Sequence, residues 1–262
     1  MSNQLKSIAI AGVLAASTLT PVAARAASII GLVDAKTLVM IDPASKKVTA
    51  TVAIKGTPGL LGIDIRPADG MLYGVSKDGA IVTIDPKSGQ ATMKSKLTET
   101  LKDGVVATVD FNPVADRIRV MGSDGASHRI NVDDGKVTVD GWHRFKDGDV
   151  NAGKTPKVIA GAYSNSFKGT QGTALYNIEA TSGALVTQAP PNDGVLNTVG
   201  ALGVTLDGPV AFNIVSSSAD KNDAWLVTGG NLYSVDLKTG KATMAGKLSG
   251  VSGKLTDIAW MD

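Results

Sequence analysis

The stretch AIVTIDPKSGQATMKSKL, residues 80–97, has a close counterpart in NLYSVDLKTGKATMAGKL, residues 231–248. In both copies, two short runs of strand-forming residues flank a segment of the form Asp-x-x-x-Gly. Pro, Ser, Thr and Gly in such a segment favour a β-turn. The pair therefore predicts a β-hairpin that recurs along the chain, which is the mark of a repeat architecture.

Further copies of the turn set the length of the repeat. DPASK begins at Asp42, DPKSG begins at Asp85 and the looser NVDDG begins at Asn131. Successive copies therefore start 43 and 46 residues apart. An earlier element, GIDIRP in residues 62–67, recurs as TVDFNP in residues 108–113. Units of about 47 residues with four short strands are the size of propeller blades.

The ends of the chain indicate how the units are arranged. The first unit lacks an opening strand, and a spare strand-like run, LTDIAWM, ends the chain at residues 255–261. Pairing the two ends would remove exposed sheet edges. We therefore predict an all-β fold, a five-bladed β-propeller of four-stranded blades, closed by pairing of the C-terminal strand with the N-terminal blade. A β-sandwich and an open solenoid are the alternatives.

The segment DFNPVADRIRV, residues 110–120, resembles the bacterial domain-of-unknown-function family 4394. Further similar stretches are GDVNAGKTP in residues 148–156, TALYNIE in residues 173–179 and PPNDGVLNTVGALG in residues 190–203. The resemblance covers most of the chain. It implies an exported, propeller-like β-protein, and it implies neither an activity nor catalytic residues.

The first 26 residues have the pattern of a secretory signal peptide. Lys6 precedes a small, apolar run, and Ala24-Arg25-Ala26 fits a cleavage site. The run is too short for a membrane span, and no later segment approaches one. We expect residues 27–262 to form a single propeller domain, exported to the periplasm or the medium.

Composition excludes several classes of function. The chain has no Cys, which rules out disulfides, thiolate metal sites and a cysteine nucleophile. Aromatic residues make up 4% of the chain, and removal of Lys6 and Arg25 leaves basic and acidic residues in balance. Neither feature suits a nucleic-acid partner. We expect a monomer that binds a small molecule or a protein.

The repeat register places polar side chains together at the predicted propeller centre. Asp64, Asp110 and Asn213 take equivalent positions in three first strands, and Arg66 and Asn112 follow two residues later. Paired carboxylates serve as acid and base where their environments separate their pKa values. The alternatives are ligand binding and a structural role, in which the Asp side chains bond the backbone of the next blade.

Two arginines and both histidines have mainly structural interpretations. Arg117 and Arg119 lie on one face of a predicted strand, where they would form salt bridges between blades or recognise an anion. His128 and His143 are far apart in the sequence, with no serine placed beside either. We expect both histidines to be surface or structural residues.

One loop carries two incomplete ligand-binding patterns. GDVNAGKT, residues 148–155, has the spacing of a phosphate-binding loop, but Pro156 and a strand-like run follow where a helix is needed. Asp147, Asp149 and Asn151 have the spacing of the first calcium ligands of a calcium loop. A Gly-rich turn is the interpretation we favour, with calcium as the alternative and no other cofactor expected.

These features favour a non-enzymatic binding or scaffold module. The competing class is a hydrolase or lyase that uses Asp64 and Asp110, with calcium as a possible requirement.

Overall fold

The computed structural model describes Met1 and residues 28–261. The predicted signal peptide, residues 1–26, therefore lies almost wholly outside the described residues. Within the described part of the chain, no helix is long and apolar enough to cross a membrane.

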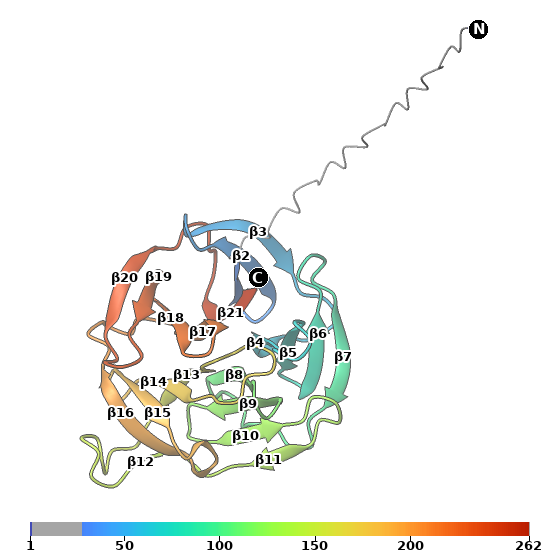
Figure 1. Cartoon of the computed structure of the whole chain (residues 1–262). Coiled ribbons are helices and arrows are strands. Elements are labelled where there is room, and N and C mark those ends of the chain that lie inside the picture. Colours follow the sequence, from blue (N-terminus) through green and yellow to red (C-terminus); the bar gives the residue numbers. More distant parts are fainter. Residues whose placement is uncertain (2–27, 262) are drawn as a thin grey trace.

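Five antiparallel sheets stand in a ring around a central axis (Figure 1). Blade 1 contains, from the axis outward, β21 (Leu255–Met261), β1 (Ser28–Val33), β2 (Thr37–Asp42) and β3 (Lys47–Ala53). Blade 2 contains β4 (Leu60–Ile65), β5 (Leu72–Ser76), β6 (Ala80–Ile84) and β7 (Ala91–Lys96). Blade 3 contains β8 (Ala107–Asn112), β9 (Arg117–Gly122), β10 (Ser127–Ile130) and β11 (Val137–Val139).

Blades 4 and 5 complete the ring. Blade 4 contains β13 (Val158–Tyr163), β14 (Leu175–Glu179), β15 (Ala184–Gln188) and β16 (Val195–Ala201). A short extra strand, β12 (Arg144–Phe145), pairs in parallel with β16 at its outer edge, and a 3₁₀ turn spans Pro191–Asp193. Blade 5 contains β17 (Ala211–Ser218), β18 (Lys221–Thr228), β19 (Asn231–Val235) and β20 (Ala242–Lys247).

The predicted five-bladed propeller is confirmed, and so is the closure of its ring. β21 is the innermost strand of blade 1 and pairs antiparallel with β1, from Ser28 opposite Met261 to Val33 opposite Leu255. The chain thus builds its first blade from both ends. The extra strand β12 was not expected from the sequence, because two residues are too few to produce a strand pattern.

The apolar core lies between the blades. The buried side chains form clusters that each join two neighbouring blades; one unites Ile30 and Leu32 of blade 1 with Ile63 and Leu72 of blade 2. Another unites Phe111 and the strands of blade 3 with blade 2. Each blade is therefore stabilised by its two neighbours, and closure of the ring buries the faces of the first and last blades.

The repeated turn also joins neighbouring blades through the backbone. Gly135, which ends the turn between β10 and β11, accepts a hydrogen bond from Thr98 N of blade 2 at 3.1 Å. Gly89 of blade 2 accepts one from Lys55 N of blade 1 at 2.9 Å. The Asp-x-x-x-Gly signature thus marks contacts between blades as well as hairpins.

Candidate functional site

The innermost strands bring the predicted polar residues together. β4, β8, β13, β17 and β21 contact one another in a closed circle around the axis. In this circle, Asp64 and Asp110 are each 4% exposed and Asn213 is 7% exposed. These side chains are therefore buried where the blades meet.

Each central carboxylate bonds the backbone of the next blade. Asp64 Oδ2 accepts a hydrogen bond from Phe111 N at 2.8 Å, and Asp110 Oδ1 accepts one from Tyr163 N at 2.8 Å. Both donors are amides of inner strands that would lack a partner without the carboxylate. Both aspartates therefore make the contact that the structural interpretation predicted, a hydrogen bond to the backbone of the next blade.

A third central carboxylate, Asp257, was missed from the sequence. Its Oδ2 accepts a hydrogen bond from Ile63 N at 2.9 Å, and this aspartate lies two residues before the position in its strand that corresponds to Asp64. Thr108 is its counterpart in blade 3 and bonds Gly161 N at 2.9 Å. A comparison of the position two residues before Asp64 in each repeat would have found this second ring of contacts.

The central carboxylates hold protons more tightly than ordinary aspartates do. Burial is the main cause, and it raises the pKa of Asp64 to about 7, although hydrogen bonds from Phe111 and Asn213 act against it. Burial also raises the pKa of Asp110 well above its usual value, helped by the charge of Asp64. Burial raises the pKa of Asp257 in the same way. A carboxyl group near neutral pKa can both donate and accept hydrogen bonds at physiological pH.

Asp64 and Asn213 line a cavity at one end of the axis, which we call the axial cavity. It has a volume of about 270 Å³ and lies over the C-terminal ends of β4, β17 and β21. Its walls include Phe167 and Lys168 from the β13–β14 loop and Trp260 from β21. Neither Asp110 nor Asp257 is among the described residues that line it.

The loop that forms one wall of the axial cavity is held in place by blade 5. Ser166 N donates to Ser216 Oγ at 2.9 Å, and Asn165 N donates to Asn222 Oδ1 at 2.7 Å. The opposite wall is supported by Trp260, whose ring stacks on Trp225 with centroids 5.8 Å apart. The cavity is therefore formed before any ligand arrives, which lowers the entropic cost of binding.

Arg66 and Asn112 do not point into this cavity. The Arg66 guanidinium makes a two-point contact with Asp116 of blade 3, at 2.8 and 2.5 Å, and a bond to Tyr73 Oη at 3.2 Å. Asn112 Oδ1 accepts the amides of Val114 and Ala115 and so caps the turn after β8. The polar groups of both side chains are therefore already hydrogen-bonded within the protein.

Arg117 and Arg119 are also occupied by the protein. Arg119 is 1% exposed and donates to Tyr163 Oη at 2.7 Å and to Asp140 at 2.8 Å. A further bond to Asn192 at 2.7 Å links blades 3 and 4. Arg117 donates to backbone oxygens of the preceding turn. The salt bridge of Arg119 is thus to an acidic residue of its own blade, and its bonds to blade 4 are to neutral side chains, which differs from the predicted salt bridge between blades. These bonds leave little room for an anion on Arg119.

The loop proposed for calcium is likewise held by protein donors. Asp149 accepts bonds from Thr198 N, Thr198 Oγ1 and Asn151 N, all within 2.8 Å. Lys154 Nζ lies 2.8 Å from Asn151 Oδ1, so a cation already occupies that oxygen. Among the residues that the structure describes, Asp147 joins no group of three or more acidic or histidine side chains that could hold a metal. No helix follows the loop, because β13 begins at Val158.

Both histidines are buried, which excludes the surface position and leaves the structural role, of the two possibilities that the sequence predicted. His143 is 7% exposed, and burial, together with the nearby Arg119 charge, lowers its pKa to about 4. His128 is 4% exposed, and burial lowers its pKa too. Both imidazoles are therefore neutral at pH 7.

Fold and site together define the protein as a five-bladed β-propeller with a small preformed cavity on its axis. The chain belongs to the family described as Domain of unknown function (DUF4394), which matches residues 37–259. The resemblance that the DFNPVADRIRV segment indicated is therefore confirmed.

One comparison with a solved structure supports the fold, and the fold alone. A protein of unknown function from Bacteroides thetaiotaomicron VPI-5482 has a similar structure, with a TM-score of 0.53 and 14% identity over 88% of this chain and 63% of that chain. Another from Bacteroides caccae has a TM-score of 0.45 and 12% identity, over 84% of this chain and 72% of that chain. No curated protein matches the sequence.

Proposed function

We propose that this protein is an exported, non-enzymatic binding module whose ligand is a small polar molecule held in the axial cavity. The observation that carries the proposal is a preformed cavity of about 270 Å³ whose lining includes a buried carboxyl group, Asp64, that titrates near neutral pH. The signal-like residues 1–26 support export.

The lining of the axial cavity suggests which ligands it suits. Asp64 and the amide of Asn213 offer both donors and acceptors of hydrogen bonds, and Phe167 and Trp260 offer apolar walls. Lys168 is exposed at the rim. This combination favours a compact molecule with hydroxyl or amino groups, and the volume limits it to about the size of a single sugar ring.

The hydrolase or lyase alternative has less support. It needs two carboxyl groups on one substrate, yet Asp110 lies outside the lining of the axial cavity and bonds Tyr163 N. A scaffold that binds other proteins would not need the cavity. We therefore favour small-molecule binding over both.

The test is the melting temperature of residues 27–262 with monosaccharides, lactones, organic acids, nucleotides and metal ions. A ligand at 100 times its dissociation constant adds about 2.7 kcal/mol, or about 5–10 °C for a chain of this length. Asp64→Asn should abolish the shift. Asp257→Asn is the matched control, since Asp257 is equally buried and bonds the backbone but does not line the cavity.

Two results would contradict the proposal. One is a ligand-induced shift that survives Asp64→Asn, and the other is no shift from any member of the panel. A rise specific to calcium and reversed by a chelator would instead support the loop that contains Asp147 and Asp149.

A further inference from the structure

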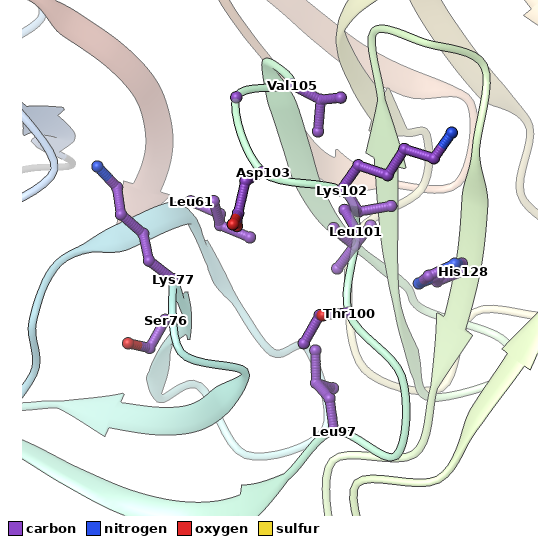
Figure 2. A pocket seen from close by; sticks show the side chains of 12 residues that line it. Leu61, Ser76, Lys77, Leu97, Thr100, Leu101, Lys102, Asp103, Val105 and His128 are labelled. Carbon is purple, nitrogen blue, oxygen red and sulfur yellow. The ribbon is translucent and has the colours of Figure 1, made fainter.

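A second cavity opens between blades 2 and 3, and we call it the lateral cavity (Figure 2). It lies by Leu61, near the N-terminal end of β4, whereas the axial cavity lies by Asp64 and Ile65 at the other end of that strand. The two cavities therefore open toward opposite faces of the ring. The segment between β7 and β8, which includes Leu101 and Val105, forms much of its wall.

Aliphatic side chains form one part of the wall of the lateral cavity. Leu61, Leu97, Leu101 and Val120 supply aliphatic surface from four separate parts of the chain. The charged residues Lys77, Lys102 and Asp103 are exposed, so their charges stay in water. They carry both signs and do not select a charged ligand.

Three uncharged polar residues line the cavity, of which Ser76 bonds Gly59 O and Thr100 is exposed, whereas His128 is buried. It comes from β10, it is 4% exposed, and it lines the cavity. No hydrogen bond joins its imidazole to another residue that the structure describes, and its nitrogens, unlike those of His143, are not fully shielded from solvent. Because burial lowers its pKa, the ring is neutral and has one donor and one acceptor nitrogen.

Solvent that enters the lateral cavity can therefore reach the His128 nitrogens, and a ligand there can take the place of that solvent. The β-strand around His128 does not need an imidazole, since its neighbours across β9 and β11 are Val120 and Val139. A hydrogen-bonding group in the cavity would satisfy the ring.

We propose that the lateral cavity is a second binding site, for an uncharged, ring-sized molecule with one hydroxyl or carbonyl group that hydrogen-bonds His128. The volume of about 210 Å³ sets the size. A dry protein cavity of about 150 Å³ holds benzene, so this one holds a ring with a few further atoms. The site is independent of the axial cavity and of the function proposed for it.

The test uses 4-methylphenol as the probe and toluene as its partner without a hydroxyl group, titrated into residues 27–262. Calorimetry should show that 4-methylphenol binds at least tenfold more tightly than toluene. The side-chain ¹⁵N resonances of His128 should shift with 4-methylphenol and return when it is removed. This measurement needs no variant and so stands even if a substitution prevents folding.

Three variants assign the binding to this cavity. His128→Leu should weaken the binding of 4-methylphenol at least tenfold, because it removes the hydrogen bond. It should leave the affinity for toluene unchanged, because leucine keeps that part of the wall apolar. His143→Leu is the control, since His143 is also buried with an unpartnered ring but lies outside this cavity. Leu101→Trp should exclude both probes by filling the space.

The proposal fails if millimolar 4-methylphenol leaves the His128 resonances unchanged. It also fails if His128→Leu and His143→Leu weaken binding equally. Asp64→Asn, which tests the axial cavity, should leave 4-methylphenol binding unaltered, so the two proposals stand or fall separately.

Discussion

Gly135 shows why the repeated turn ends in glycine. Its φ is +73°, in the left-handed region, and a Cβ built there would lie 1.9 Å from Lys96 O of the preceding blade. The positive φ and the short distance to Lys96 O both exclude a side chain at this position. The Lys96 oxygen belongs to the backbone of a strand, so it cannot move away as a flexible side chain could. We expect Gly135→Ala to destabilise the protein by about 2–5 kcal/mol, the sum of left-handed strain and overpacking.

Gly148 provides a matched control for that measurement. It has a similar φ of +81°, but nothing lies within 4 Å of its added Cβ. Gly148→Ala should cost about 1 kcal/mol, the conformational part alone. Urea denaturation of the two variants measures the difference, and equal losses would mean that contact between blades contributes little.

β21 shows how much one strand contributes to closure. It buries Leu255 and Ile258 against blades 1 and 5 and Ala259 against blades 1 and 2. Its Asp257 also accepts a hydrogen bond from an amide of blade 2. Each large buried aliphatic side chain contributes about 1.5–3 kcal/mol, and a whole domain is stable by about 5–15 kcal/mol. We expect a chain ending at residue 254 to lose cooperative thermal unfolding.

A peptide of residues 253–262 should restore that transition, because it can pair with β1 in the register of the intact chain. A scrambled peptide of the same composition is the control. Unfolding of the shortened chain at the temperature of the full chain would show that closure by β21 is dispensable.

The ring was predictable from the sequence because its determinants are local and repeated. The turns at Asp42 and Asp85 and the missing first strand could all be read from spacing. The hydrogen bonds to the blade backbone were harder to assign. Asp64 and Asp110 could be placed at the centre, but Asp257 was missed, since it lies two residues before the position in its strand that corresponds to Asp64.

The cavities were not predictable, because they depend on how distant segments meet. Phe167 reaches the axial cavity on a loop that blade 5 fixes through Ser216. The burial of His128 depends on the segment around Leu101, which has no repeat pattern. Spacing fixes strands and turns, whereas loop conformations depend on contacts between blades.

The molecule as a whole should be more stable at pH 6.5 than at pH 8.5. The buried carboxyl groups of Asp64, Asp110 and Asp257 have raised pKa values, so the folded state binds protons that the unfolded state releases. Their stabilisation is complete below the unfolded pKa, about 4, and is lost as pH rises through the folded values. Since the pKa of Asp64 is about 7, this group alone raises the free energy of unfolding at pH 6.5 by about 1 kcal/mol relative to pH 8.5.

The histidines oppose the carboxyl groups at the lower end of this pH interval. Burial lowers the pKa of His143 to about 4 and also lowers that of His128, so both are neutral in the folded state. Unfolded histidines have a pKa of about 6.5 and are half protonated at about pH 6.5, which lowers stability there by about 0.4 kcal/mol for each histidine. As pH falls below 6.5, the unfolded histidines gain protons and oppose the carboxyl groups. His143→Phe should therefore extend the rise in stability to lower pH.

Differential scanning calorimetry at pH 6.5 and 8.5 tests whether the protein is more stable at the lower pH. The intact protein should melt about 2–4 °C higher at pH 6.5, because the carboxyl groups of Asp110 and Asp257 add to that of Asp64 and together outweigh the two histidines. A net gain of about 1 kcal/mol produces a change of this size in a chain of this length. Asp64→Asn should reduce the difference, because the amide keeps an acceptor for Phe111 N without an ionisable group. A higher melting temperature at pH 8.5 would mean that the central carboxylates are ionised in the fold and find a cation there.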